Sequence, residues 1–266
     1  MSARETPARL MEAAAEVARI AGEIALRHYR SASLVIDRKP DGSPVTNADL
    51  AAEDAARDWI RARFPEDGIL GEEYGIERGG ARRRWILDPI DGTRTFLRGV
   101  PLWGVLVAVV EGDDTIAGAA AFPALGELAC ASRGEGSWSN GERLSVSRVD
   151  RISDALVLTT DETFSANRSL RARWGELEGS AGMVRSWGDC YGYLLVATGR
   201  AEVMVDPVLS SWDAAALLPI VEEAGGRFTD WAGERRIDGG GAVATNAVLA
   251  SEARRLLDIP YSAEAP

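Results

Sequence analysis

Histidine is almost absent from this sequence. The 266 residues include a single one, His28, in a stretch whose apolar spacing predicts a helix near the N-terminus. One imidazole excludes zinc sites built from several histidines, and it permits a Ser-His-Asp or Cys-His nucleophile only if His28 itself takes part. We interpret His28 as a helix-surface residue. If the chain is an enzyme, carboxylates and hydroxyls must carry its chemistry, and oxygen ligands favour Mg²⁺, Mn²⁺ or Ca²⁺.

Cysteine and long apolar runs are scarce as well. The two cysteines, Cys130 and Cys190, form neither a disulfide framework nor the spacing of a metal knuckle. No apolar run approaches the roughly 18 residues that a membrane span needs. The N-terminus lacks the apolar core and the small-residue cleavage site of a signal peptide. These absences predict a cytoplasmic protein without a membrane partner.

The sequence also has few features of a nucleic-acid binder. Its net charge is −11, and no cluster of lysine or arginine with aromatic residues is present. Most of the positive charge comes from arginine, and Lys39 is the one lysine that stands out in the first half. We interpret the run Arg82–Arg84 as a solvated entry to a strand. The composition, 46% hydrophobic and 27% charged, is typical of a globular protein.

The most informative stretch is residues 85–93, with the sequence WILDPIDGT. Its first three residues are apolar and predict the end of a buried strand. Asp88 and Asp91 follow directly, and Pro89 between them pushes Asp88 toward an extended conformation. Gly92 frees the backbone at the point where the chain must turn.

Thr93 is predicted to cap a short helix that continues to Leu97. Two carboxylates at the end of a strand would then lie beside free N–H groups at the start of a helix. Carboxylates bind hard cations, and the N–H groups of a helix start bind phosphate oxygens. The stretch therefore predicts a metal-assisted phosphate site. A strand followed by an ordinary Asp-Gly turn is the alternative interpretation.

Two amphipathic helices are predicted before this stretch, over residues 8–30 and from 47 to about 64. Thr46 or Asn47 is the expected cap of the second helix, and Asp49 falls in its first turn.

Two adjacent acids, Glu72 and Glu73, follow a short apolar strand at residues 69–70. Adjacent acids at a strand end repel each other, so we consider a functional role, with solvated loop acids as the alternative. Further apolar or alternating runs predict strands at 104–110, 116–123, 127–132, 155–158, 202–206 and 243–244.

The second half alternates strands with helices. A helix is predicted over residues 165–177, and a strand end, a glycine turn and a buried helix follow from Val184. Asp213 lies in the first turn of a long apolar helix, where the helix dipole favours an anion. Gly225 is expected to close that helix, and a last short helix is predicted from Ser251.

Four motifs together resemble the inositol monophosphatase family of Mg²⁺-dependent, lithium-sensitive phosphatases. They occur in the family's order across nearly the whole chain: VTNAD at 45–49, GEE at 71–73, DPIDGT at 88–93 and WDAA at 212–215. The resemblance implies an α/β (α+β) fold, a layered αβαβα sandwich of the sugar-phosphatase type. It also implies two sub-domains: residues 1–145 with most metal ligands, and residues 146–266 with Asp213 and the substrate pocket.

The resemblance further implies roles for the acidic residues. Two or three Mg²⁺, with Mn²⁺ as a possible substitute, would be held by Glu72, Asp88, Asp91, Asp213 and the carbonyl of Ile90.

The remaining roles in the family concern the phosphate and the attacking water. The amides of Gly92 and Thr93 would hold the phosphate. Thr93 and Asp49, with Glu72, would position and activate the water. A metal lowers the pKa of bound water, which explains how such a site works without histidine. Glu73 would be structural.

Within the family, two stretches are similar to the histidinol-phosphate phosphatase branch: LRGVPLWG at 97–104 and WGDCYGY at 187–193. Inositol-type members have the sequence GSAA where this chain has residues 188–191, and they have a glutamate where this chain has Asp206. The expected substrate pocket therefore contains Asp189, Asp206 and the nearby Arg185. Two acids suit a cationic leaving group, and histidinol phosphate carries an ammonium and a titratable imidazole.

Alternatives remain for these residues and for the function. Asp189 could be a helix cap, and Arg185 could pair with an acid across the fold. The expected activity is Mg²⁺-dependent hydrolysis of L-histidinol phosphate in histidine biosynthesis. The resemblance also implies a homodimer, because members of the family are often dimers. The alternatives are an inositol-1-monophosphatase, a broad sugar-phosphate phosphatase, a nucleotide 3′-phosphatase, which the acidic pocket disfavours, and a regulatory protein that keeps the fold.

Overall fold

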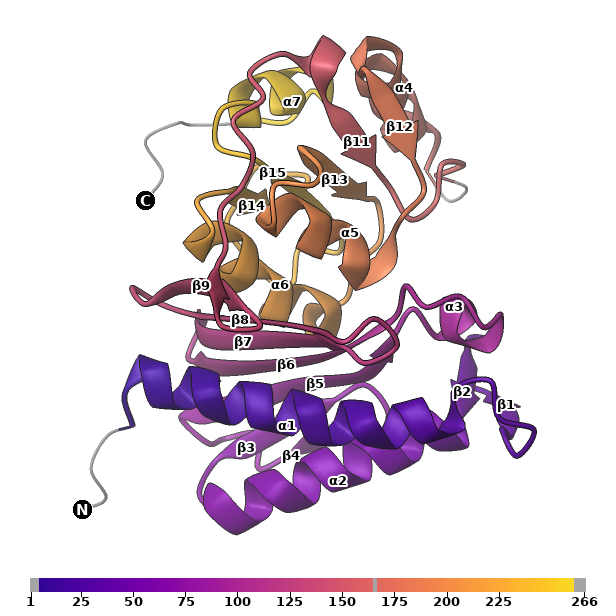
Figure 1. Cartoon of the computed structure of the whole chain (residues 1–266), viewed down its shortest axis with the longest axis vertical. Helices are drawn as coiled ribbons and strands as arrows, with labels where there is room; N and C mark the ends of the chain where they lie inside the picture. The colour runs from indigo at the N-terminus through magenta and orange to yellow at the C-terminus, as the bar shows by residue number, and fades with distance from the viewer. Residues whose placement is uncertain (1–4, 165–166, 261–266) are drawn as a thin grey trace.

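The computed structural model describes residues 5–164 and 167–260, in which layers alternate between helices and sheets (Figure 1). A pair of helices covers the outer face of a large sheet. A second pair lies between that sheet and a smaller one, and a third pair covers the outer face of the smaller sheet. This is the αβαβα sandwich that the resemblance implies.

The outer pair next to the large sheet consists of α1 (Pro7–His28) and α2 (Asn47–Arg63). Both predicted amphipathic helices are confirmed. Of the two candidate caps of α2, Thr46 is the N-cap, and it forms a capping box with Asp49. The short strands β1 (Ile36–Arg38) and β2 (Pro44–Thr46) pair with each other just before α2.

The large sheet has the strand order β10-β9-β8-β7-β6-β5-β3-β4. Its strand β5 runs parallel to β3 and antiparallel to β6. The strands are β3 (Gly68–Gly71), β4 (Gly75–Glu77), β5 (Arg83–Asp91), β6 (Gly104–Glu111), β7 (Asp114–Phe122), β8 (Glu127–Ser132), β9 (Gly136–Ser139) and β10 (Glu142–Arg143).

The inner helices α5 (Asp189–Ala197) and α6 (Ser211–Glu223) are apolar on nearly every side because a sheet packs on each side of them. One continuous core joins the inner face of the large sheet, both helices and the smaller sheet. The division of the chain near residue 145 remains a prediction, and this core crosses it.

The smaller sheet has the order β12-β11-β13-β15-β14, and α4 (Arg168–Ser180) and α7 (Ala250–Leu256) cover its outer face. Its strands are β11 (Leu156–Leu158), β12 (Met183–Arg185), β13 (Val203–Asp206), β14 (Arg227–Thr229) and β15 (Ala242–Thr245). A 3₁₀ turn, η1 (Ile152–Asp154), precedes β11. The helix predicted from residue 165 begins at Arg168, and residues 165–166 lie outside the described part.

Sequence patterns gave no signal for several short strands, namely β2, β4, β9, β10 and β14. They are two to four residues long, too short to show an alternating pattern. The helix α3 (Thr93–Leu97) is present, but its N-cap is Gly92, so the expectation that Thr93 caps it is wrong. Thr93 Oγ1 instead donates to the carbonyl of Ile90 at 3.1 Å.

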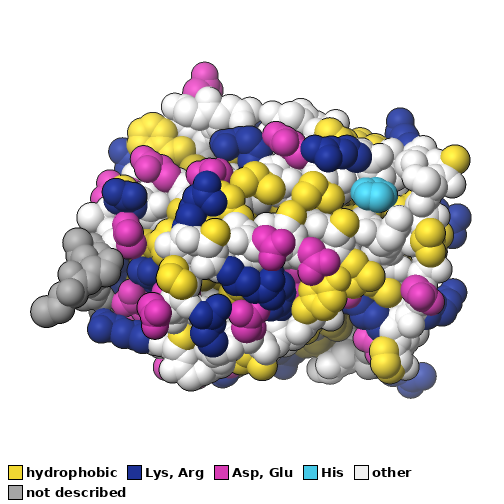
Figure 2. Space-filling model, turned by 90° about the horizontal axis from the view of Figure 1, so that it is seen from below, with side chains coloured by type: hydrophobic (Ala, Val, Ile, Leu, Met, Phe, Trp, Pro, Cys, Tyr) yellow, Lys and Arg dark blue, Asp and Glu magenta, His cyan; other side chains and the backbone are white. Residues whose placement is uncertain are grey.

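The surface on the α1 and α2 side mixes acidic and basic side chains, with apolar side chains between them (Figure 2). Across residues 5–164 and 167–260, none of the helices combines the length and the apolar character that crossing a membrane requires.

Candidate active site

A β-bulge brings two aspartates to one face of β5. Asp88 pairs with Leu106 of β6 and Asp91 with Gly104, so three steps on β5 match two on β6. Side chains alternate along a regular strand, so residues three apart would otherwise point to opposite faces. The extra residue restores a common face, and Pro89 is tolerated there because the ladder is interrupted.

A third aspartate, Asp213, comes from the first turn of α6. Its Oδ2 accepts a hydrogen bond from Ser210 N at 2.7 Å, as part of a capping box. Carboxylate oxygens of Asp88, Asp91 and Asp213 all lie within 4.8 Å of one another. The sequence predicted this meeting of residues far apart in the chain, and the structure brings them together.

Burial raises the pKa of all three carboxylates, and the charges of neighbouring acids add to the shift. Burial, and next the charges of Glu72 and Asp91, raise the pKa of Asp88 well above its ordinary value. Burial and the charge of Asp189 raise the pKa of Asp91 in the same way. Burial raises the pKa of Asp213 to about 6, although hydrogen bonds oppose the shift. The cluster therefore disfavours its own full ionisation, and a divalent cation would remove that cost.

Asp49 is another buried acid, near enough to Glu72 for the two charges to interact. Its Oδ2 accepts hydrogen bonds from the backbone N (2.8 Å) and the hydroxyl (2.5 Å) of Thr46. Its Oδ1 is buried and has no hydrogen-bond partner in the part of the chain described. Burial raises the pKa of Asp49 to about 6, and the charge of Glu72 adds to the shift. A buried carboxylate oxygen without a donor indicates a place for a water or a cation.

Lys39, the only lysine of the chain, binds both acids of the GEE motif. Its Nζ lies 2.6 Å from Glu72 Oε1 and 2.9 Å from Glu73 Oε1. Partial burial opposes its charge, but the hydrogen bonds to these glutamates raise the pKa of Lys39. Burial raises the pKa of Glu73 to about 7 despite the bond from Lys39. No motif of the sequence assigned Lys39 to the site, although a single lysine in an arginine-rich chain was a usable signal.

A second residue that the sequence analysis missed is Glu53 of α2. Its oxygens accept hydrogen bonds from Glu73 N at 2.8 Å, Tyr74 N at 3.2 Å and Arg57 Nε at 2.8 Å. Gly71 makes room for this carboxylate, since a Cβ there would lie 1.9 Å from Glu53 Oε1. Glu53 therefore holds the turn that carries the two glutamates. In the sequence it resembles any acid on the polar side of an amphipathic helix.

The start of α5 packs against the corner between β5 and α3. Cys190 N donates to Asp91 Oδ2 at 2.5 Å, and Thr95 Oγ1 donates to Asp189 Oδ2 at 2.9 Å. Gly92, with φ 81°, is suited to this corner because a Cβ would lie 2.9 Å from Asp189 Oδ2. The second half of the chain is thus joined to the motif of the first half at the acidic cluster.

Asp189 is not a helix cap. The N-cap of α5 is Gly188, and Asp189 N donates to Thr160 Oγ1 at 2.8 Å. Its side chain lines a cavity of about 380 Å³ beside the acidic cluster. Burial raises the pKa of Asp189, against the hydrogen bond from Thr95 and the charge of Arg94. The alternative of a capping role is therefore wrong.

Asp206 and Arg185, also expected at the substrate pocket, lie outside the acidic cavity. Asp206 is 2% exposed at the end of β13 and accepts from Thr160 N at 3.0 Å and Tyr193 Oη at 3.1 Å. Burial raises its pKa to about 7. Arg185 is exposed on β12, and its Nη1 donates to Val184 O at 2.7 Å. Their roles as substrate contacts remain predictions.

The acidic cluster lines an open cavity of about 540 Å³. Its walls are formed by Lys39, Pro40, Asp41, Ser43, Glu72, Asp88, Ile90, Asp91, Gly92, Thr93, Ser210, Trp212 and Asp213. The carboxylates and the Ile90 carbonyl provide only oxygen donors, which suits a hard divalent cation better than zinc or copper. The residues present therefore fit a metal of that class.

Comparisons with known proteins agree with this geometry. The model of the inositol monophosphatase family matches residues 7–260. The chain is 47% identical to a histidinol-phosphatase of Chlorobaculum parvum, over 89% of this chain and 92% of that protein. It is 40% identical to a histidinol-phosphatase of Mycobacterium tuberculosis, over 87% and 91%. The structure of the extragenic suppressor protein suhB from Bartonella henselae has a TM-score of 0.88 at 28% identity, covering 94% and 98%.

The chain belongs to the inositol monophosphatase family, whose members depend on metal ions. Its acidic cluster lies where a layered fold of this kind brings a strand end and a helix start together.

Proposed function

We propose that the chain is a Mg²⁺-dependent phosphomonoesterase that hydrolyses L-histidinol phosphate to L-histidinol and phosphate. The observation that carries this proposal is the convergence of Asp88, Asp91 and Asp213 on one open cavity. The relatives named histidinol-phosphatase support the choice of substrate.

Metal binding would use the acidic cluster. Asp88, Asp91 and Asp213 would hold the ions, together with Glu72 and the carbonyl of Ile90. A bound Mg²⁺ supplies polarisation of the phosphoryl group and a lower pKa for bound water. Two or three ions are expected from the family.

The remaining chemistry would come from the chain's own groups. Asp49 has a pKa of about 6 and a buried Oδ1 that has no hydrogen-bond partner among the described residues, so it can accept a proton near neutral pH. Thr93 and Glu72 would orient the water with it. The amides of Gly92 and Thr93, at the start of α3, would hold phosphate oxygens while the leaving group departs.

The leaving group would lie in the 380 Å³ cavity that Asp189 lines, next to Gly92. Arg94 and Arg98 line the same cavity, and Asp189 is the acid on its wall. The carboxylate of Asp189 would attract the ammonium group of histidinol, and it would offer nothing comparable to neutral inositol. Asp206 lies behind this wall, 2% exposed, so it would act through Thr160 and Tyr193.

The proposal is tested by phosphate release from histidinol phosphate, inositol 1-phosphate and a neutral alkyl phosphate, each with Mg²⁺ and with EDTA. Histidinol phosphate should have the highest kcat/KM, and EDTA should abolish all turnover. Faster hydrolysis of the inositol ester would favour an inositol or general sugar-phosphate phosphatase. If none of the three esters is hydrolysed in the presence of Mg²⁺, the result would favour the alternative of a regulatory protein that keeps the fold.

Asp189→Asn sharpens the substrate assignment. This variant should raise KM for histidinol phosphate roughly tenfold, because one desolvated charge pair is lost. It should leave the neutral alkyl phosphate nearly unchanged, and that ester is the internal control. An equal loss for both esters would show that Asp189 supports the site structurally. A cytoplasmic location and a homodimer are also proposed, and fractionation and sedimentation would check them.

A further inference from the structure

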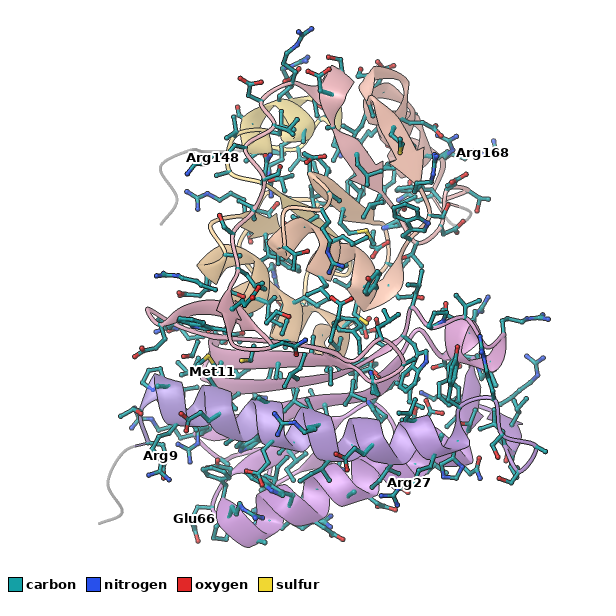
Figure 3. The ribbon with its side chains drawn as sticks, in the orientation of Figure 1. Arg9, Met11, Arg27, Glu66, Arg148 and Arg168 are labelled. Carbon is teal, nitrogen blue, oxygen red and sulfur yellow. The ribbon has the colours of Figure 1, made fainter. Side chains whose placement is uncertain are left out.

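A second cavity, which shares no lining residue with that of the acidic cluster, lies between α1 and the β8–β9 part of the large sheet. We call it the α1–β8 groove. Its volume is about 620 Å³, and it is lined by Met11, Glu12, Ala15, Arg19, Glu23, Leu26, Ala121, Pro123, Gly126, Glu127, Leu128, Cys130, Trp138, Asn140 and Gly141. Figure 3 shows Met11 on the first part of α1, at the side that faces the sheet.

The floor of the groove is apolar sheet surface that α1 leaves partly uncovered. Cys130 of β8 and Trp138 of β9 are directly paired, so their side chains share a face, and Leu128 lies on the same face two residues before Cys130. Leu128 and Cys130 pack at the edge of the core beneath α1 and are only partly buried. A cavity of this size with a mainly apolar lining is typical of small-molecule sites.

The rim of the groove is acidic. Glu12, Arg19 and Glu23 of α1 are spaced by seven and four residues, which places them on one side of the helix. All three are exposed. Neither glutamate forms an ion pair within residues 5–164 and 167–260. Two carboxylates without an ion-pair partner in the described part of the chain, against one guanidinium, favour a ligand with a positive group.

One residue of the groove is connected to the acidic cluster. Glu127 accepts hydrogen bonds from Tyr191 Oη at 3.2 Å and Arg200 Nη2 at 2.8 Å. Tyr191 lies in the first turn of α5, next to Cys190, whose N–H holds Asp91 Oδ2. A ligand cation that draws Glu127 toward the groove would weaken its bond to Tyr191 and so act on the start of α5.

We propose that the α1–β8 groove binds a small arylalkylamine, with the ring over Leu128 and Trp138 and the ammonium group among the carboxylates of Glu12, Glu23 and Glu127. Its occupancy is transmitted through Glu127 and Tyr191 to the start of α5.

Binding is measured by calorimetry on the whole chain, with tryptamine as the probe and indole-3-propionate, an anion with the same ring, as the control. Tryptamine should bind at least about tenfold more tightly than the propionate. Glu12→Gln/Glu23→Gln should remove that preference, and Met11→Trp, which fills the groove, should weaken both probes. Glu66→Gln, an exposed acid away from Met11 in Figure 3, should change nothing. Equal binding of both probes, or binding that Met11→Trp does not alter, would overturn the site.

The connection is tested with Tyr191→Phe, which removes the hydroxyl that meets Glu127. In the parent protein, saturating tryptamine should shift the metal dissociation constant at least twofold, and in Tyr191→Phe it should not. A shift of the same size in both proteins would overturn this route. Sedimentation of the parent and of Met11→Trp tests whether a second copy fills the groove: a dimer that Met11→Trp dissociates would overturn the small-molecule assignment.

Discussion

Asp88 and Asp206 occupy comparable places in the two sheets but have opposite surroundings. Each lies near the end of a strand, each is 2% exposed, and burial raises the pKa of both. Asp206 has donors for its two oxygens, from Thr160 N and Tyr193 Oη. Asp88 has a donor for its Oδ1, Ile90 N at 3.0 Å, and it also faces the carboxylates of Asp91 and Asp213.

The difference shows which buried acid needs an external cation. A carboxylate with hydrogen-bond donors can remain in the interior as a structural group, whereas grouped carboxylates repel one another until a cation joins them. Burial alone therefore does not identify a metal ligand, and the neighbours of each oxygen must be examined.

The largest expected effect is on activity, and it separates the grouped carboxylates from Asp206. Asp91→Asn should lower kcat/KM by at least about 10³-fold, or ~4 kcal/mol of transition-state stabilisation, because it removes one of the three grouped carboxylates. Asp206→Asn should stay within about tenfold of the parent. Phosphate release measures both, and circular dichroism checks that both remain folded. Comparable losses in the two variants would abolish the distinction.

The next effect concerns stability without metal. Asp213 has a pKa of about 6 in the folded protein against an ordinary 3.8, so the folded state binds its proton more tightly than the unfolded state. The free energy of unfolding should therefore be highest below pH 3.8 for this group and fall as pH rises toward 6, by roughly 1.4 kcal/mol per unit of pKa difference. Added Mg²⁺ should reverse the fall, because ionised carboxylates bind it. Thermal unfolding in EDTA and in Mg²⁺ measures this; a Tm insensitive to Mg²⁺ at neutral pH would contradict it.

Asp206 should contribute a pH dependence that metal does not alter. Its pKa of about 7 means that its share of stability is lost as pH rises from 3.8 toward 7. Asp206→Asn should flatten that part of the curve equally in EDTA and in Mg²⁺. Denaturant titrations at several pH values provide the measurement. If Mg²⁺ cancelled the effect, Asp206 would belong to the metal site after all.

The smallest expected effect concerns Lys39, whose ammonium group is held by Glu72 and Glu73. Lys39→Met should shift the metal midpoint to lower concentration, by about three- to tenfold, because the ammonium no longer competes for Glu72. Calorimetric titration with Mg²⁺ measures the midpoint, and Arg61→Met, an exposed cation paired with Glu77, is the matched control. An unchanged or higher midpoint would show that Lys39 does not compete with the metal.

Much of the fold followed from local patterns. The 3.6-residue apolar period located α1 and α2, and Gly92 marked the corner after β5. The family motifs supplied the order of layers. The bulge that aligns Asp88 with Asp91 had no local signal, because it depends on pairing with β6.

The sequence alone determined the chemistry available here: oxygen ligands, one lysine and no imidazole cluster. It also determined the carboxylates of the DPIDGT and WDAA motifs. Only the tertiary structure decided which of them meet, that Glu53 supports the GEE turn, and that Asp206 is satisfied by neighbours. The physical reason is that a side chain's charge is a local property, whereas its burial and its partners depend on residues far away in the chain.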